Sequence, residues 1–296
     1  MCFVQSVLCV LNKMNIIFFG DTEFSRPSRE ALIKNGYDLT VIGKRDGSLK
    51  DDKLFEYFKN LNPDLCIVAD YGRIIPSRYL ETPKYSFINI HPSLLPKYRG
   101  PSPIQTAILN GDSKTGVTIM VVDEEVDHGP ILAQREWKSL ISNLEFLKLR
   151  GELAELGAEL LVETLPKYVS GEIKPKPQDH SEATSTKMFS REDGKINWNE
   201  PAEKIYNQIR ALNPEPGTWS NWQKRILNIK ESGIWNLESG INDNRPGNIV
   251  KLSGEVAVAT KTCYLILKQI QLEGRRITNA KDFVNGHPDF IGSILE

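Results

Sequence analysis

Short apolar, β-branched runs alternate with amphipathic stretches through the first half of the chain. The strand-like runs lie at residues 15–20, 38–43, 64–70, 86–92 and 116–123. Helix-like stretches separate most of them, at residues 29–36, 51–61 and 103–111. This alternation predicts an α/β fold, with a Rossmann-like and mostly parallel sheet covered by helices. In such sheets ligands gather at the carboxyl ends of the strands.

The second half of the chain follows a different pattern. Leucines spaced by three and four residues between Ser142 and Val169 predict a long amphipathic helix that closes the first domain. The stretch "GEIKPKPQDHSEATST" is polar and rich in proline, which is typical of a linker. After one further helix ended by Asn-Pro, the short β-type segments predict a small, OB-like β-barrel domain. The predicted domains are therefore 14–170 (Rossmann-like), 171–190 (linker) and 191–296 (C-terminal β-barrel).

Composition places the chain among ordinary globular proteins. The 296 residues are 40% hydrophobic and 25% charged, which is enough to bury a core in one large domain or two smaller ones. The formal net charge is -1, so the protein as a whole does not attract polyanions. A nucleic-acid partner would have to be bound by a local basic patch.

The cysteines and the first residues indicate the compartment. Cys2, Cys9, Cys66 and Cys263 are scattered and form no CxxC pair, which favours a reducing environment. The opening "MCFVQSVLCVLNK" has no basic start and no small-residue cleavage site, so we interpret it as an extension or an upstream start rather than a signal peptide. No segment reaches the ~18 to 20 apolar residues that span a bilayer. The expectation is a cytoplasmic protein without a membrane partner.

Several common site types are not indicated by the sequence. The first strand is followed by "FFGDTEF", with one glycine where a dinucleotide site needs GxGxxG, and no Walker loop occurs. The histidines show no HExxH motif and no cysteine at ligand spacing, so no metal site is expected. Ser93 lies in no GxSxG elbow, and its hydroxyl is expected to bond locally.

The most informative short motif is "NIHP", at the end of one predicted strand. Asn89 and His91 differ by two positions, so both side chains point to one face while Ile90 packs on the other. The prolines that follow cannot continue a β-ladder, which places both polar groups at a strand end. An Asn amide can donate to a developing oxyanion. A histidine can move a proton near neutral pH.

This pair would be completed by a carboxylate that fixes the imidazole tautomer and favours its charged form. The stretch "VVDEEVDHGPIL" offers four, again after a strand: Asp123, Glu124, Glu125 and Asp127. On spacing alone, Asn89 and His91 could equally be loop hydrogen-bonders, and the acidic run a solvated turn. The chemistry therefore remains open at this point.

The whole stretch from residue 89 to 132, "NIHPSLLPKYRGPSPIQTAILNGDSKTGVTIMVVDEEVDHGPIL", resembles the signature of the 10-formyltetrahydrofolate-dependent formyltransferases. The resemblance implies a catalytic set of Asn89, His91 and Asp127. It also implies 10-formyltetrahydrofolate as formyl donor, held partly by "SLLP", which is Ser93, Leu94, Leu95 and Pro96. In that family a neutral amine attacks the formyl carbon with no covalent enzyme intermediate.

Segments outside this stretch bear on which amine is formylated. "GDTEFSRPSREAL", "EDGKINW", "IYNQIRALNPEPGTW" and "LEGRRITNAKDFVNGHPDF" resemble the methionyl-tRNA formyltransferases, although Asp21 and Glu23 depart from the usual opening. The resemblance implies N-formylation of the α-amino group of methionyl initiator tRNA during translation initiation. It also implies that residues 191–296 contact the tRNA. A monomer is expected, although the sequence is silent on oligomeric state.

One departure from the methionyl-tRNA formyltransferases bears on substrate recognition. Only "KRDGSLKDD" follows the second predicted strand, where the tRNA enzymes usually carry a longer basic loop. Lys44 and Arg45, or clustered residues such as Arg275 and Arg276, would have to supply the missing contacts. The shortened loop favours the alternative of an N-formyltransferase for a nucleotide-linked amino sugar. A third alternative is a non-catalytic folate-binding or RNA-binding protein.

Overall fold

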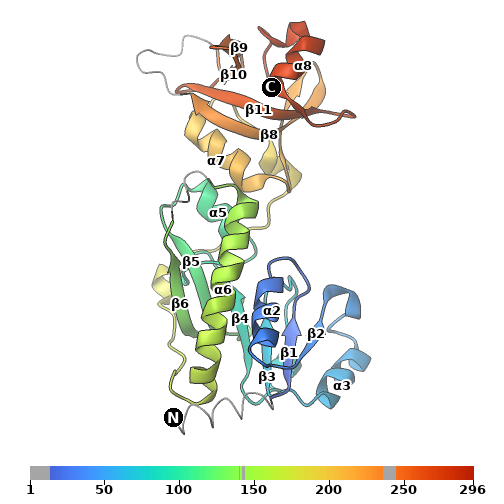
Figure 1. The fold of residues 1–296 in the computed structure, drawn as a ribbon, viewed down its shortest axis with the longest axis vertical. Coiled ribbons are helices and arrows are strands. Elements are labelled where there is room, and N and C mark those ends of the chain that lie inside the picture. The colour runs from blue at the N-terminus through green and yellow to red at the C-terminus, as the bar shows by residue number, and fades with distance from the viewer. Residues whose placement is uncertain (1–13, 140, 142–143, 236–244) are drawn as a thin grey trace. The chain divides into compact units, whose positions relative to one another are not determined.

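The computed structural model describes residues 14–139, 141, 144–235 and 245–296. The opening segment, with Cys2 and Cys9, lies outside the described residues. The chain forms two compact units (Figure 1). One comprises the residues up to Ile104 with Lys114–Leu140 and Leu147–Lys187, and the other comprises Gln105–Ser113, Ile141–Phe146 and Met188–Glu296.

The first unit contains a six-stranded sheet in the order β2-β1-β3-β4-β5-β6. The first four strands are parallel: β1 (Ile16–Phe19), β2 (Leu39–Ile42), β3 (Leu65–Val68) and β4 (Phe87–His91). The last two run antiparallel to their neighbours: β5 (Thr115–Val121) and β6 (Ile131–Trp137). This confirms the predicted α/β sheet with mainly parallel strands, and it adds β6, which the sequence analysis did not predict.

Most of the helices described before Ser170 fall close to the predicted stretches, but the short helix at Ser77–Leu80 was not predicted. The helices are α2 (Arg26–Lys34), α3 (Asp52–Asn60), α4 (Ser77–Leu80), α5 (Pro103–Leu109) and α6 (Phe146–Val169). The Asp51 carboxylate caps α3 by accepting from the Lys53 amide at 2.9 Å. Between β2 and α3 the chain forms a 3-10 turn, η1 (Lys44–Asp46). An aromatic cluster fills the core beneath α3 and α4 and includes Phe19, Phe58, Tyr79 and Phe87.

The long helix α6 packs directly against β4 and β5 at a glycine. A Cβ at Gly157 would lie 2.8 Å from Ile90 Cγ2 and 3.4 Å from Val117 Cγ1. Only glycine therefore allows this separation between helix and sheet without a shift of the core. Because Ile90 lies between Asn89 and His91 on β4, the close approach also fixes the strand that carries them.

The segment expected to be a linker is hydrogen-bonded to the first unit over much of its length. Lys176 exchanges two backbone hydrogen bonds with Ile131, at 2.7 and 2.8 Å. Ser185 forms a parallel bridge with Arg99. We call residues 176–186 the strap. The first unit extends to Lys187, and the second resumes at Met188.

The second unit is built on an antiparallel sheet in the order β7-β8-β11-β10-β9, with β12 paired to β11. Its strands are β7 (Thr218–Trp222), β8 (Arg225–Trp235), β9 (Ile249–Leu252), β10 (Glu255–Ala259), β11 (Tyr264–Leu272) and β12 (Thr278–Asn279). Its helices are α7 (Ala202–Leu212) and α8 (Ala280–Gly286), and it also includes α5 from Gln105 onward. The sequence analysis predicted a helix at α7 and short β-type segments at β8, β9, β10 and β11, but it predicted neither β7, β12 nor α8.

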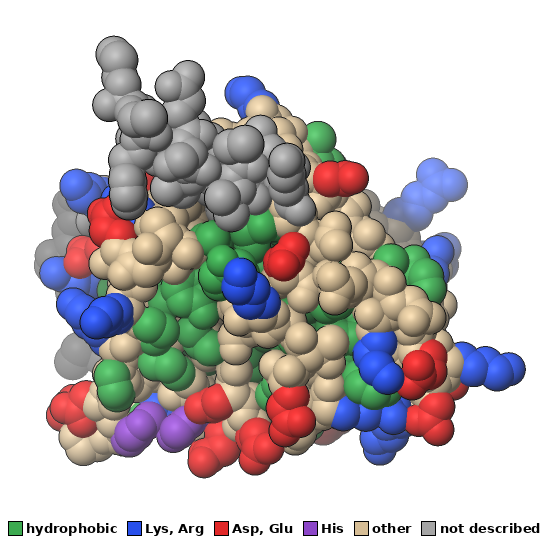
Figure 2. All heavy atoms as spheres, turned by 90° about the horizontal axis from the view of Figure 1, so that it is seen from below, with side chains coloured by type: hydrophobic (Ala, Val, Ile, Leu, Met, Phe, Trp, Pro, Cys, Tyr) green, Lys and Arg blue, Asp and Glu red, His purple; other side chains and the backbone are tan. Residues whose placement is uncertain are grey.

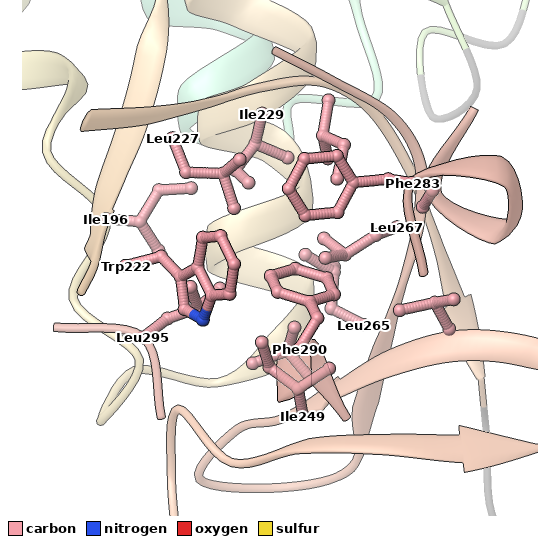
Figure 3. Packing of buried hydrophobic residues seen from close by; sticks show 14 of the residues in the cluster. Ile196, Trp222, Leu227, Ile229, Ile249, Leu265, Leu267, Phe283, Phe290 and Leu295 are labelled. Atoms are coloured by element: carbon pink, nitrogen blue, oxygen red, sulfur yellow. The ribbon is translucent and has the colours of Figure 1, made fainter. Parts of the chain in front are cut away.

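Three aromatic side chains close the core of the second unit (Figure 3). Trp222 from β7 meets Phe283 of α8 and Phe290 edge to face, with ring centroids 5.6 and 5.2 Å apart. Such pairs stabilise beyond their buried area, by about 0.5–1.5 kcal/mol each. Through Phe283 and Phe290, the C-terminal segment therefore packs against β7 of the second unit. Across both units, none of the described helices is long and apolar enough to span a membrane.

Two glycines of α6 form a matched pair for testing the packing of the helix on the sheet. Gly157→Ala should destabilise the protein by ~1–3 kcal/mol, because the added methyl group overpacks against Ile90. Gly151→Ala should stabilise it by up to ~1 kcal/mol, because a Cβ there meets nothing within 4 Å and alanine favours the helix. Urea unfolding monitored by circular dichroism measures both. Equal effects of the two substitutions would contradict this packing.

Candidate active site

Strand β4 presents two polar side chains at its carboxyl end. Asn89 and His91 share one face, and Ile90 points the other way toward Gly157 of α6, as the spacing predicted. Asn89 is partly buried, whereas His91 is only 4% exposed. A polar ring so far from water needs hydrogen-bond partners within the protein.

The acidic loop reaches this face by folding back. β5 runs antiparallel to β4, with Val121 opposite Ile88 and Thr118 opposite His91, so the end of β5 points away from the end of β4. The loop of residues 122–130 reverses the chain, and the Val121 amide donates to the Pro130 carbonyl at 2.9 Å. A Cβ at Gly129 would lie 2.0 Å from the Val121 carbonyl oxygen, so the reversal requires glycine.

Asp127 brings the three predicted catalytic residues together. Its Oδ1 accepts a hydrogen bond from Asn89 Nδ2 at 3.1 Å and lies 3.5 Å from His91 Nδ1. Its Oδ2 accepts from the Gly100 backbone amide at 2.8 Å. The side chain is 13% exposed, so these donors replace most of the water that would otherwise solvate the carboxylate. The Asp127 backbone adopts a φ of +51°, which is unusual for a residue other than glycine.

A backbone carbonyl, rather than the expected carboxylate, fixes the tautomer of His91. Nε2 of His91 lies 2.9 Å from the Tyr98 carbonyl oxygen. Because a carbonyl oxygen only accepts, Nε2 must carry the proton and donate it. Nδ1 of the neutral ring therefore presents its lone pair on the side where Asp127 lies. Asp127 remains positioned to stabilise a proton that Nδ1 picks up.

The other acidic candidates have different partners. Asp123 Oδ2 pairs with Nδ1 of His128 at 2.7 Å, and Glu124 accepts from the Ser77 hydroxyl at 3.0 Å. Glu125 has an exposed side chain. Among the described acidic residues of this loop, Asp127 alone contacts both Asn89 and His91.

The loop expected to hold folate is fastened to β5. The Thr118 hydroxyl donates to the Ser93 carbonyl at 2.7 Å and accepts from the Leu95 amide at 3.1 Å. Ser93 and Leu95 are 1% and 3% exposed, so their side chains shape the loop. Leu94 and Pro96 are half-buried, and their side chains can still touch a ligand. The loop is thus a pre-formed element beside His91.

Arg99 connects the loop after "SLLP" with the strap. Its guanidinium donates to Gln178 Oε1 at 3.1 and 2.8 Å and reaches His180 Nδ1 at 2.8 Å. The His180 ring stacks on His128 with centroids 4.2 Å apart. Histidine side chains, purple in Figure 2, lie side by side at the surface of the protein next to carboxylates. The contacts of Tyr98, Gly100 and Gln178 were not predicted, since most run through backbone groups or through the expected linker.

Covalent and metal chemistry find little support in the described residues. Burial raises the pKa of the Cys66 thiol well above its usual value, which keeps it protonated. The Ser93 hydroxyl donates to the Lys97 carbonyl at 2.7 Å. Among the described residues, no three metal-ligating side chains gather at one place. Lys44 and Arg45 have exposed side chains on η1. Arg73 stabilises this turn by donating a hydrogen bond to the Lys44 carbonyl at 2.6 Å.

Comparison with known proteins adds a second line of argument. A relative from Thermodesulfovibrio yellowstonii, named methionyl-tRNA formyltransferase, is 39% identical over 92% of this chain and 95% of its own. The fold resembles that of HypX from Aquifex aeolicus in complex with tetrahydrofolic acid, with a TM-score of 0.70, 20% identity and coverage of 94% of this chain and 48% of that one. It also resembles an N-formyltransferase from Helicobacter canadensis in complex with folinic acid and dTDP-3-aminofucose, with a TM-score of 0.64, 22% identity and coverage of 86% and 98%.

Family profiles cover both units of the chain. The profile described as formyl transferase matches residues 6–165, which include β4, the "SLLP" loop and Asp127. The profile described as formyl transferase, C-terminal domain, matches residues 188–288. Together with the identity to the Thermodesulfovibrio protein, these matches show that the chain belongs to the formyl transferase family.

Proposed function

We propose that this protein is an enzyme that transfers the formyl group of 10-formyltetrahydrofolate to the α-amino group of methionyl initiator tRNA, a step of translation initiation. The observation that carries the chemistry is the convergence of Asn89, His91 and Asp127 at the end of β4. The acceptor is proposed from the 39% identity to a relative named methionyl-tRNA formyltransferase.

The proposed roles of Asn89 and His91 follow from the hydrogen-bonding groups that their other contacts leave available. Asn89 Nδ2 uses one hydrogen on Asp127, and its second N–H has no other hydrogen-bond partner among the described residues. That N–H can donate to the formyl oxygen as it becomes an oxyanion. His91 Nδ1, with its lone pair free in the neutral ring, can take the proton that the attacking amine loses.

The reaction then balances without a covalent enzyme intermediate. The amine nitrogen forms a bond to the formyl carbon, and His91 Nδ1 receives the excess proton from that nitrogen. The bond from the formyl carbon to N10 of the folate breaks, and N10 accepts the proton from His91. Asp127 lies 3.5 Å from Nδ1 and stabilises the imidazolium formed between these steps.

The donor is proposed to lie against the "SLLP" loop, Ser93 to Pro96. Thr118 fixes the loop backbone, while Leu94 and Pro96 offer the side chains that remain partly accessible. A rigid apolar edge next to a proton-transfer residue suits the flat ring system of a folate. The formyl group must then lie within reach of both Asn89 and His91.

The C-terminal domain predicted at residues 191–296, which lies within the second unit, is proposed to be an OB-like barrel that contacts the tRNA. Arg191 and Lys195 lie over the ring of Trp219, at 5.5 and 5.6 Å from its centroid. Burial, and then the nearby Arg191 charge, lower the pKa of the Lys230 amine. Clustered cations around an aromatic ring are a common way to bind single-stranded RNA. Arg275 and Arg276 add exposed charge in the turn after β11.

Two further assignments accompany this function. The first unit is proposed to be Rossmann-like in its mononucleotide-type arrangement of parallel strands, with the site at a strand end. The cytoplasm is the proposed compartment, because the proposed reaction supplies formylated initiator tRNA to translation, which takes place there. Initiator methionyl-tRNA and 10-formyltetrahydrofolate are the only partners that the proposal requires.

A nucleotide-linked amino sugar is the second candidate acceptor. The turn η1 (Lys44–Asp46) stands where a longer basic loop would help hold an acceptor stem. The same three residues could formylate a sugar amine, since the chemistry at the formyl carbon is unchanged. The fold of the Helicobacter canadensis protein is compatible with this alternative.

Loss of the His91 imidazole should slow transfer strongly. His91→Ala should reduce kcat by ~10²–10⁴-fold because the amine proton loses its acceptor, while binding of a non-transferring folate analogue, measured by calorimetry, stays near that of the unchanged protein. His128→Gln is the matched control, since His128 also pairs with a carboxylate but is 30% exposed. It should keep most activity. If His91→Ala retained most activity, the proposed proton transfer would be wrong.

The choice of acceptor can be measured directly. With 10-formyltetrahydrofolate as donor, methionyl initiator tRNA should be converted to formyl-methionyl-tRNA, and an amino-deoxysugar nucleotide should remain unreacted. Product analysis by mass spectrometry after nuclease digestion distinguishes the two. Formylation of the sugar alone would replace the proposed acceptor, while the roles of Asn89 and His91 would stand.

A further inference from the structure

One buried side chain of the strap has all its hydrogen bonds directed at the loops around the site. Gln178 is 5% exposed. Its Nε2 donates to the backbone carbonyls of Asp127 at 2.9 Å and Gly129 at 2.7 Å. Its Oε1 accepts twice from the Arg99 guanidinium. Because carbonyls only accept and a guanidinium only donates, the amide has one possible orientation and no spare capacity.

These bonds act on the backbone that aims the Asp127 carboxylate. Asp127 adopts a left-handed φ of +51°, which a residue with a Cβ adopts only when its surroundings hold it. Gln178 clamps the carbonyl of Asp127 and that of Gly129 two residues later. The carboxylate is in turn held by Gly100 and Asn89. The backbone and the side chain of Asp127 are therefore fixed by different groups.

The strap also holds the loop that supplies the partners of His91 and Asp127. The Tyr98 amide donates to the Thr184 hydroxyl at 2.9 Å, and the Arg99 amide donates to the Thr184 carbonyl at 2.8 Å. The Thr186 amide donates back to the Arg99 carbonyl at 2.7 Å. Tyr98 provides the carbonyl for His91 Nε2. Gln178 joins this loop to the Asp127 loop through Arg99.

We propose that Gln178 is a positioning residue for formyl transfer, which holds Asp127 beside His91 without touching the reacting atoms. This inference rests on the proposed roles of His91 and Asp127. The strap is then part of the catalytic unit rather than a passive connection between units. Its contribution should appear in kcat, because Gln178 orders the proton-transfer pair, and its hydrogen bonds go to Arg99, Asp127 and Gly129 rather than to the "SLLP" loop.

Two substitutions separate hydrogen-bond donation from space filling. Gln178→Leu removes both donation to the carbonyls and acceptance from Arg99 at similar volume. Gln178→Glu keeps the shape and the bond to Arg99, but it places a carboxylate oxygen against two carbonyl oxygens. If Gln178 only filled space, the Glu variant would behave like the unchanged protein. If donation positions Asp127, both variants should lower kcat at least tenfold, with KM for the folate donor changed less than threefold.

Tyr168→Phe is the matched control in the same unit. The Tyr168 hydroxyl donates to the Tyr85 carbonyl at 3.0 Å, so its loss removes a hydrogen bond from side chain to backbone away from the site. It should lower the melting temperature by a few degrees and leave kcat unchanged. Full-length variants are assayed at least 15 °C below the lowest melting temperature, which separates activity from unfolding.

A double-mutant cycle with Asp127→Asn provides the decisive readout. If Gln178 acts through Asp127, Gln178→Leu should lower single-turnover rates tenfold or more alone but less than twofold in the Asp127→Asn background. Equal losses in both backgrounds, or a native kcat for Gln178→Leu, would overturn the positioning role. Native activity of Asp127→Asn itself would instead overturn the proposed function of that carboxylate, so the two failures are distinguishable.

Discussion

The carboxylate of Asp127 is the interaction on which the site depends. It is a charged group with 13% of its side chain exposed, and burial of a charge is costly unless hydrogen bonds replace water. The protein supplies two donors, the Gly100 backbone amide and the Asn89 side-chain amide, and it places the His91 ring 3.5 Å from the carboxylate. These groups come from one loop and one strand, and Asp127 lies on a second loop, so hydrogen bonding to one carboxylate assembles all three elements. Structural and chemical requirements coincide at this residue.

The direction of β5 in the sheet explains why the loop that carries Asp127 has to reverse before it reaches Asn89 and His91. Had β5 been parallel to β4, the acidic loop would have followed the strand end to the same edge. β5 is antiparallel, so the loop of residues 122–130 has to return along β4, and this reversal requires glycine at 129 and a left-handed backbone at Asp127. Such a loop is stable only when other segments hold it, which is the task that Gln178 performs from the strap. The left-handed backbone at Asp127 and the buried Gln178 thus both follow from the reversal that the antiparallel β5 requires.

The sequence predicted those features that local pattern determines. Apolar runs gave β1 to β5 within two residues or so, and the spacing of Asn89 and His91 placed them on one face of β4. The choice of Asp127 among four acids came from resemblance to a family, since the spacing left it open. The strand β6, which is only partly buried and alternates without a strong apolar run, was missed. The strap was interpreted as a linker because its composition is polar, whereas its hydrogen bonds to distant backbone groups leave no local signal in the sequence.

Burial, more than distance, distinguishes the histidine–carboxylate pair that is proposed to transfer the proton from the second such pair nearby. His128 and Asp123 are closer, at 2.7 Å, but their side chains are 30% and 36% exposed. Water screens that pair, and an exposed ion pair is worth little. His91 and Asp127 are 3.5 Å apart with 5% and 13% exposure, so a proton that arrives on His91 interacts with the carboxylate through a medium of lower dielectric constant. The interaction grows only when the imidazolium forms, which is the step at which stabilisation accelerates a reaction. A longer, buried contact therefore serves proton transfer better than a shorter contact at the surface.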